Sequence, residues 1–256
     1  MKIIPAILEK DYLKVKDTLE TFSKVATTIQ IDVVENSFVA KENTSENKEI
    51  DNSKKGDREV VLDTWLPNSY EDINGYNLNL EFDMMVSDIE KYLDMLYHYD
   101  AKKIIIHTRD MNIVDYMNVY EKIKERNHFV QVGICDTDTE KIKATYGYYD
   151  YVQLMGIENI GAQGQGFDTN VIDKIKLVKE FLDNKKEDGS VSANKNILDG
   201  ALSQKEIYIQ IDGAMNPENI KLCKDAGAVS FAVGSYFKNA IKNNNLKEVY
   251  TELKSI

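Results

Sequence analysis

Three aspartates interrupt segments that are otherwise rich in apolar and β-branched residues. Asp32 lies in TTIQIDVV, Asp83 lies in LNLEFDMM, and Asp212 directly follows IYIQI. A carboxylate without a partner is expensive to bury in such a segment, and three carboxylates brought together would repel one another. A hard divalent cation with oxygen ligands, such as Mg²⁺ or Mn²⁺, compensates their charge. We therefore predict a metal site of Asp32, Asp83 and Asp212, to which Gln30 could add its carbonyl oxygen.

Small residues follow three predicted strands in the second half of the chain. A glycine-rich loop spans residues 161–166, Gly-Ala follows Asp212, and Gly-Ser follows VSFAV. Backbone N–H groups in such turns can hold a phosphate without an arginine, because few side chains obstruct its approach. The residues predicted to contact a phosphate are Gly164, Gln165, Gly213, Ala214, Gly234 and Ser235.

These residues need a fold that brings distant strand ends to one place. Apolar periodicity predicts eight strands that alternate with helices, at 2–8, 27–34, 78–85, 103–107, 129–135, 149–155, 207–211 and 229–233. The length of 256 residues suits one (β/α)8 TIM barrel, whose active site lies at the C-terminal ends of its parallel strands. An open doubly wound sheet is the alternative. It would not bring the ends of the first three strands beside those of the last two.

The aspartates and the strand that contains Gln30 have a plainer interpretation. Each aspartate alone could cap a following turn or helix. Gln30 and Asp32 could also face water on an edge strand, which would avoid the cost of burying them. The coincidence of three aspartates at strand ends favours a common site.

Two polar segments interrupt the barrel pattern, which we assign to one domain of residues 1–256. Residues 40–60 follow the second strand, so they would lie on the face with the chemistry, either as a lid or as a solvated insertion. Residues 184–204 precede the seventh strand. We expect them to form a surface loop on the opposite side, without a functional role.

Charge and composition restrict the partners of the chain. A net charge of −11 argues against binding to nucleic acid or to an anionic membrane through bulk electrostatics. Cys135 and Cys223 have no metal-type spacing and are expected to be reduced thiols. The N-terminal apolar run is short and contains Pro5, so it predicts neither a signal peptide nor a membrane span. The expected location is the cytoplasm.

The order of these motifs resembles the ribulose-phosphate 3-epimerases and their hexulose-phosphate relatives, in the ribulose-phosphate-binding barrel superfamily. The similarity covers nearly the whole chain outside the two polar segments. In the first half of the chain, three segments resemble the family's motifs: IPAIL from Ile4, IQIDVVENSFV from Ile29 and EFDMMV from Glu81. In the second half, three more segments resemble them: QLMGIENIGAQGQGF, IDGAMNPENI and AVGSYF.

The resemblance implies proton exchange at the carbon beside a ketone, with two aspartates as acid and base on opposite faces of an enediolate. Asp32 and Asp212 match these aspartates, and a divalent metal beside them would polarise the carbonyl. Met85 matches a methionine that shields the intermediate. The positions that match phosphate contacts are Gly164, Gly213, Gly234 and Ser235. The implied partner is a small phosphorylated ketose such as ribulose 5-phosphate, and barrels of this kind often form homo-oligomers.

This sequence departs from the family at its metal ligands. Gln30 and Asp83 stand where the family has two histidines, and oxygen ligands in their place favour Mg²⁺ or Mn²⁺ over Zn²⁺. The family's first-strand serine, a methionine and a glycine are replaced by Ala6, Val34 and Ala214. A catalytically degenerate barrel that binds a sugar phosphate or a protein partner is therefore the alternative to an epimerase or isomerase.

Two further possibilities concern single positions. Decarboxylases on related barrels carry an Asp-x-Lys motif, and Val33 and Val34 follow Asp32 here, which argues against that reaction. His107 ends the fourth predicted strand. It could assist at the site or could be a hydrogen-bonded structural histidine.

Overall fold

The computed structural model describes residues 1–35, 38, 73–161, 164–187, 197–198, 201–202 and 206–256. Eight parallel strands close a barrel in the order β1-β10-β9-β6-β5-β4-β3-β2. They are β1 (Lys2–Ile7), β2 (Thr28–Val34), β3 (Asn79–Met85), β4 (Lys103–His107), β5 (Gln131–Cys135), β6 (Tyr151–Met155), β9 (Tyr208–Asp212) and β10 (Ser230–Val233). The predicted (β/α)8 barrel is confirmed, and the open sheet is ruled out by the pairing of β1 with both β2 and β10.

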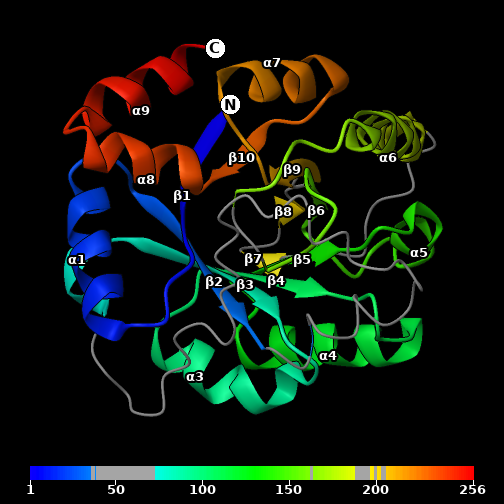
Figure 1. Cartoon of the computed structure of the whole chain (residues 1–256). Coiled ribbons are helices and arrows are strands. Elements are labelled where there is room, and N and C mark those ends of the chain that lie inside the picture. Colours follow the sequence, from blue (N-terminus) through cyan, green and yellow to red (C-terminus); the bar gives the residue numbers. More distant parts are fainter. Residues whose placement is uncertain (36–37, 39–72, 162–163, 188–196, 199–200, 203–205) are drawn as a thin grey trace, which may run out of the picture.

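Helices surround the barrel (Figure 1). They are α1 (Tyr12–Ser23), α3 (Leu93–His98), α4 (Ile113–Arg126), α5 (Thr139–Ala144), α6 (Asn170–Glu187), α7 (Pro217–Ala226), α8 (Ser235–Lys242) and α9 (Leu246–Ser255). Short 3₁₀ helices precede β3 (η2, Asn74–Tyr76) and α3 (η3, Ile89–Tyr92). Several helices begin where a side chain accepts a hydrogen bond from the first turn, as Asp11 does for α1 and Asn216 for α7.

The structure differs from the sequence prediction outside the barrel strands. The predicted loop 184–204 is wrong in part, because residues 184–187 continue α6 and residues 197–198 and 201–202 pair as the antiparallel strands β7 (Ile197–Leu198) and β8 (Ala201–Leu202). Lys186, in the last turn of α6, also pairs with Glu206 just before β9. The predicted insertion 40–60 lies outside the described residues. Two helices, α8 and α9, follow β10 in this described part of the chain.

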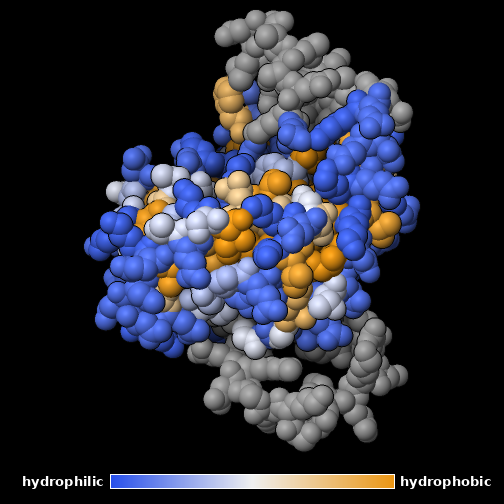
Figure 2. All heavy atoms as spheres, turned by 90° about the horizontal axis from the view of Figure 1, so that it is seen from above, coloured by the Kyte–Doolittle hydropathy of each residue, from blue (hydrophilic) through white to orange (hydrophobic). Residues whose placement is uncertain are grey.

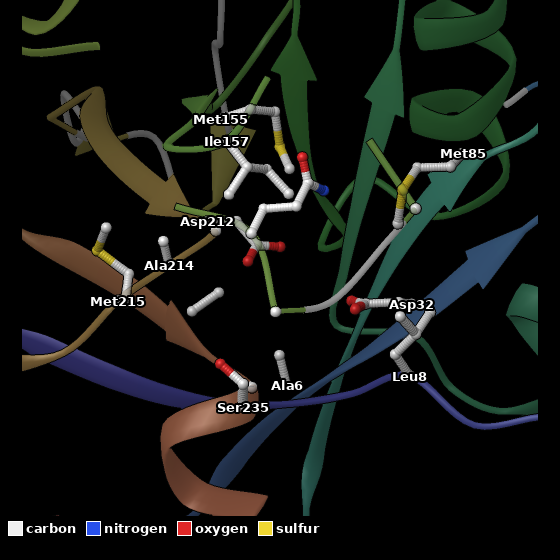
Figure 3. A pocket seen from close by; sticks show the side chains of 16 residues that line it. Ala6, Leu8, Asp32, Met85, Met155, Ile157, Asp212, Ala214, Met215 and Ser235 are labelled. Atoms are coloured by element: carbon white, nitrogen blue, oxygen red, sulfur yellow. The ribbon is translucent and has the colours of Figure 1, made fainter. Parts of the chain in front are cut away.

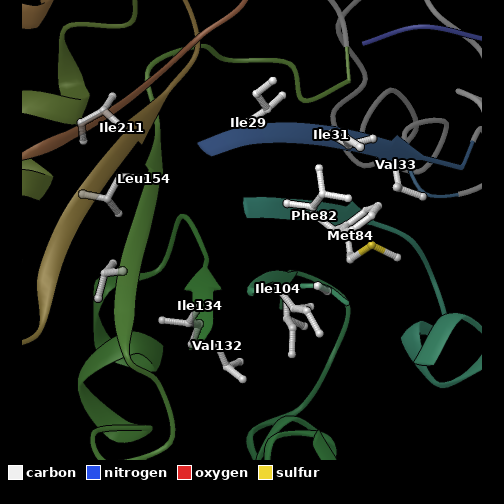
Figure 4. Packing of buried hydrophobic residues seen from close by; sticks show 14 of the residues in the cluster. Ile29, Ile31, Val33, Phe82, Met84, Ile104, Val132, Ile134, Leu154 and Ile211 are labelled. Carbon is white, nitrogen blue, oxygen red and sulfur yellow. The ribbon is translucent and has the colours of Figure 1, made fainter. Parts of the chain in front are cut away.

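Side chains alternate between the two faces of each barrel strand. In β2, Ile29, Ile31 and Val33 point outward into the layer between the strands and the helices (Figure 4), and all three are at most 1% exposed. The intervening residues Gln30 and Asp32 must then point inward. The barrel interior therefore receives polar side chains, while the main hydrophobic core surrounds it.

The outer surface is predominantly hydrophilic on the side shown in Figure 2, with hydrophobic residues dispersed between charged ones. Exposed large hydrophobic side chains are found on different helices, for example Leu13 on α1, Val114 on α4 and Leu177 on α6. Within the described parts of the chain, no helix is both long and apolar enough to cross a membrane.

Candidate active site

A cavity of about 60 Å³ opens at the C-terminal ends of the barrel strands (Figure 3). Nine of the residues predicted for chemistry or substrate binding line it: Asp32, Met85, Gly164, Gln165, Asp212, Gly213, Ala214, Gly234 and Ser235. The two other predicted residues, Gln30 and Asp83, are 0% exposed and are not part of the lining. The strand ends thus bring together residues that are far apart in the sequence.

The three aspartates converge as their positions in the strands require. Asp32 and Asp83 occupy paired positions on the neighbouring strands β2 and β3. Asp212 is the last residue of β9, and its carboxylate points across the cavity toward that of Asp32 (Figure 3). One carboxylate oxygen from each aspartate lies within 4.8 Å of the others.

Burial and mutual repulsion raise the pKa values of the two cavity-facing carboxyl groups. Burial is the larger cause for Asp32, followed by the charge of Asp212, and together they hold its pKa well above the usual value. Burial and the charge of Asp83 raise the pKa of Asp212 to about 7. The charge conflict expected from the sequence is therefore present in the folded chain.

Gln30 links the two cavity-facing carboxylates. Its amide nitrogen Nε2 donates to Asp32 Oδ1 at 2.9 Å and to Asp212 Oδ2 at 2.7 Å. The carbonyl oxygen Oε1 points the other way and accepts from Gln210 at 3.3 Å. The NH₂ end of Gln30 therefore faces the carboxylates, and this end cannot bind a cation. The predicted ligation through the carbonyl oxygen would require the amide to turn over.

Asp83 has partners of its own beside the site. Its Oδ1 lies 2.7 Å from His107 Nε2, and its Oδ2 accepts from Gln153 at 2.9 Å. Burial opposes the charge of His107, but Cys135 and Asp83 raise its pKa well above the usual value. Of the two sequence interpretations of His107, the structure shows a fully buried histidine bonded to a site carboxylate. It does not line the cavity.

The carboxylates fit a hard divalent cation in type and spacing. Oxygen atoms within 4.8 Å of one another can be bridged by one ion, and carboxylates alone suit Mg²⁺ or Mn²⁺. Asp32 and Asp212 face the cavity, so they would hold the ion most directly. Asp83 would share an oxygen that already contacts His107 or Gln153.

Two glycines, Gly213 and Gly234, line the cavity wall directly after β9 and β10. Gly213 has a φ of +102°, and a Cβ placed there would lie 2.8 Å from Ile157 Cγ1, so only glycine fits. Gly234 precedes α8, whose first backbone N–H groups have no partner within the helix. Among the described residues that line the cavity, none is Lys or Arg. A phosphate here would depend on backbone N–H groups and Ser235.

Ala214 occupies the position where the resemblance implies a glycine, and its φ is +56°. We expect Ala214→Gly to raise the free energy of unfolding by about 0.5–1 kcal/mol, because the left-handed backbone costs alanine more than the unfolded chain gains in freedom. Urea denaturation measures this difference. Ala226→Gly, in α7, is the control and should lower the stability by a similar amount, since helical backbone favours alanine. A loss in both variants would contradict the expected strain.

Sequence reasoning missed the residues beneath the cavity. Glu81, Gln153 and Gln210 are each 0% exposed and connect the site carboxylates to the middle of the barrel. A signal was present, because polar residues alternate with apolar ones in three strands: LEFD, VQL and IQID. The pattern shows that these side chains point inward, but it does not show which of them meet.

A profile of the ribulose-phosphate 3 epimerase family matches residues 2–238. The chain belongs to the ribulose-phosphate 3-epimerase family. The match covers all eight barrel strands and includes every residue of the candidate site. Membership in this family supports a carbohydrate epimerase.

Relatives within the family are distant. The ribulose-phosphate 3-epimerase of Bacillus subtilis (strain 168) is 23% identical over 239 residues, which cover 92% of this chain and 91% of the relative. That of Chlamydia muridarum (strain MoPn / Nigg) is 27% identical over 181 residues, which are 67% of each chain. A solved structure of 3-keto-L-gulonate-6-phosphate decarboxylase from Vibrio cholerae superposes with a TM-score of 0.60. The match covers 99% of this chain and 95% of that one, at 13% identity, so this likeness concerns the fold alone.

Proposed function

We propose that this chain interconverts phosphorylated ketoses through an enediolate, with Asp32 and Asp212 as the acid–base pair. The observation that carries the proposal is the placement of these two carboxylates. They point toward each other from β2 and β9 (Figure 3), and Gly213 and Gly234 line the same cavity. A ketose phosphate with its phosphate at those turns would have its ketone and the neighbouring carbon near the carboxylates.

The proposed reaction needs one carboxylate and one carboxylic acid. The carboxylate removes the proton from the carbon beside the ketone, and the electron pair moves to the carbonyl oxygen as the enediolate forms. The carboxylic acid then delivers a proton to the opposite face of the same carbon. Protonation on the opposite face inverts the configuration at that carbon, and the exchange of roles makes the reaction reversible.

The apolar residues of the cavity would protect the intermediate from water. Met85, Met155 and Met215 line the cavity together with Leu8 and Ile157 (Figure 3). Thioether side chains are apolar and adaptable, so they can cover a flat enediolate without reacting with it. Exclusion of water also strengthens the electrostatic interactions of the site.

A divalent cation is part of this proposal. Mg²⁺ or Mn²⁺ would be held by Asp32 and Asp212, with Asp83 beside them, and when bound it would polarise the ketone. Ribulose 5-phosphate is the substrate that the family membership favours.

Hydrogen–deuterium exchange tests the proposal directly. Ribulose 5-phosphate is incubated with the protein in D₂O with added Mg²⁺ or Mn²⁺, and the signal of the proton at C3 is followed by NMR. We expect this signal to disappear and the C3 epimer to form. Retention of the proton, while the sugar phosphate still raises the melting temperature of the protein, would instead support the degenerate binding barrel.

A further inference from the structure

Three glutamines meet inside the barrel, one layer below the site carboxylates. The amide nitrogen of Gln210 lies 2.5 Å from Glu81 Oε1, 3.0 Å from Gln153 Oε1 and 3.3 Å from Gln30 Oε1, so these three acceptors share its two hydrogens. These residues come from β9, β3, β6 and β2, and each is 0% exposed. An amide has a donor end and an acceptor end, so the orientation of Gln210 determines which ends its neighbours present to it.

The contact with Glu81 fixes the orientation of Gln210, and Ser230 is compatible with it. Glu81 is paired with Lys103, whose Nζ lies 2.5 Å from Glu81 Oε2, and an ionised carboxylate can only accept hydrogen bonds. The amide nitrogen of Gln210 must therefore face Glu81. On the other side, the hydroxyl of Ser230 donates to Gln210 Oε1 at 2.8 Å. Turning Gln210 over would place an oxygen against the Glu81 carboxylate, in a buried environment where this is costly.

The orientation of Gln210 determines that of Gln30. Because Gln210 offers an N–H group, Gln30 presents its carbonyl oxygen to it. The NH₂ group of Gln30 is then left at the upper end, where it contacts both Asp32 and Asp212. Gln153 follows the same rule, with its oxygen toward Gln210 and its nitrogen toward Asp83.

We infer that Gln30 is a positioning residue that holds the acid–base pair together with its two amide hydrogens, in an orientation set by Gln210 and Glu81, and that it competes with a cation. The inference rests on the proposed function of Asp32 and Asp212. Gln30 bridges the two carboxylates as a cation would, so the pair is held in place before any ion arrives. A cation bound between the two carboxylates would compete with the N–H groups of Gln30 for the lone pairs of Asp32 Oδ1 and Asp212 Oδ2. Gln30 could become a ligand only by turning over, which breaks its bond to Gln210.

The competition gives a result opposite to that expected of a metal ligand. Loss of a ligand weakens metal binding, whereas loss of a competing donor strengthens it. We expect Gln30→Met to bind Mn²⁺ roughly tenfold more tightly than the unchanged protein, which corresponds to one hydrogen bond to a charged group. Mn²⁺ affinity is measured by electron paramagnetic resonance on the full chain without substrate, so the result does not depend on turnover. Failure of the epimerase proposal would appear separately, in the deuterium exchange.

Gln210→Met provides a second variant, in case Gln30→Met does not fold. The Gln210 side chain makes its hydrogen bonds to Glu81, Gln153, Gln30 and Ser230 and not to the three aspartates, yet its removal frees Gln30 to turn, so the affinity for Mn²⁺ should again rise severalfold. Gln131→Met, on β5 and outside this network, is the matched control and should leave the affinity unchanged. Unchanged or weaker Mn²⁺ binding in both Gln30→Met and Gln210→Met overturns the inference, and so does the absence of detectable binding in all these proteins.

Discussion

Asparagine in place of either Asp32 or Asp212 should abolish the epimerisation of ribulose 5-phosphate at C3. An asparagine amide can neither remove nor deliver the proton, and a positioned acid or base typically contributes about 10²–10⁴-fold to a rate. Each single variant should therefore lose at least about 10²-fold in the rate at which the C3 epimer forms. Both variants should lose it, because the reaction needs a base on one face of the carbon and an acid on the other.

The control for these variants is a strand-end aspartate outside the cavity. Asp136 directly follows β5, is 8% exposed, and accepts from Thr108 Oγ1 at 2.6 Å. Asp136→Asn should retain epimerisation close to the rate of the unchanged protein, since Asp136 does not line the cavity. A wild-type rate of epimerisation in either Asp32→Asn or Asp212→Asn would remove that residue from the proposed pair. The thermal unfolding of every variant shows whether a lost rate reflects lost structure.

Much of the fold was predictable, because the barrel imposes simple rules on the chain. Each strand is a short apolar run, and each helix carries apolar residues at helical spacing, so both are visible in one sequence. A parallel barrel then places every strand end on one face. For this reason the sequence alone predicted that Asp32 and Asp212 lie close together, although they are 180 positions apart.

Hydrogen-bond partners inside the barrel were not predictable in the same way. Gln210 and Glu81 are 129 positions apart, and their contact depends on the register of every strand between them. The direction of the Gln30 amide depends in turn on that contact. A sequence shows that Gln30 is polar and points inward, but its two amide ends are indistinguishable without the partners. The carbonyl oxygen of Gln30 was therefore predicted as a ligand, whereas in the structure this oxygen points away from the carboxylates.

The second large effect concerns the ion pair below the glutamines. Glu81 is 0% exposed and Lys103 is 8% exposed, and Lys103 also lies over the rings of Tyr151 and Tyr208. Lys103→Met should lower the free energy of unfolding by about 3–5 kcal/mol, because it leaves the Glu81 carboxylate buried without its cation. Urea denaturation, followed by circular dichroism, measures the loss.

Neighbouring Lys102 gives a matched control for this loss. Its Nζ lies 2.6 Å from Asp100 Oδ2, but the two side chains are 49% and 65% exposed, so Lys102→Met should cost less than about 1 kcal/mol. The double variant Glu81→Met with Lys103→Met should regain most of the stability lost in Lys103→Met, since neither charge of this ion pair remains buried without its partner. Equal losses for Lys102→Met and Lys103→Met would contradict this account. The double variant also removes the carboxylate that orients Gln210. It should therefore bind Mn²⁺ more tightly than the unchanged protein, while it is more stable than Lys103→Met.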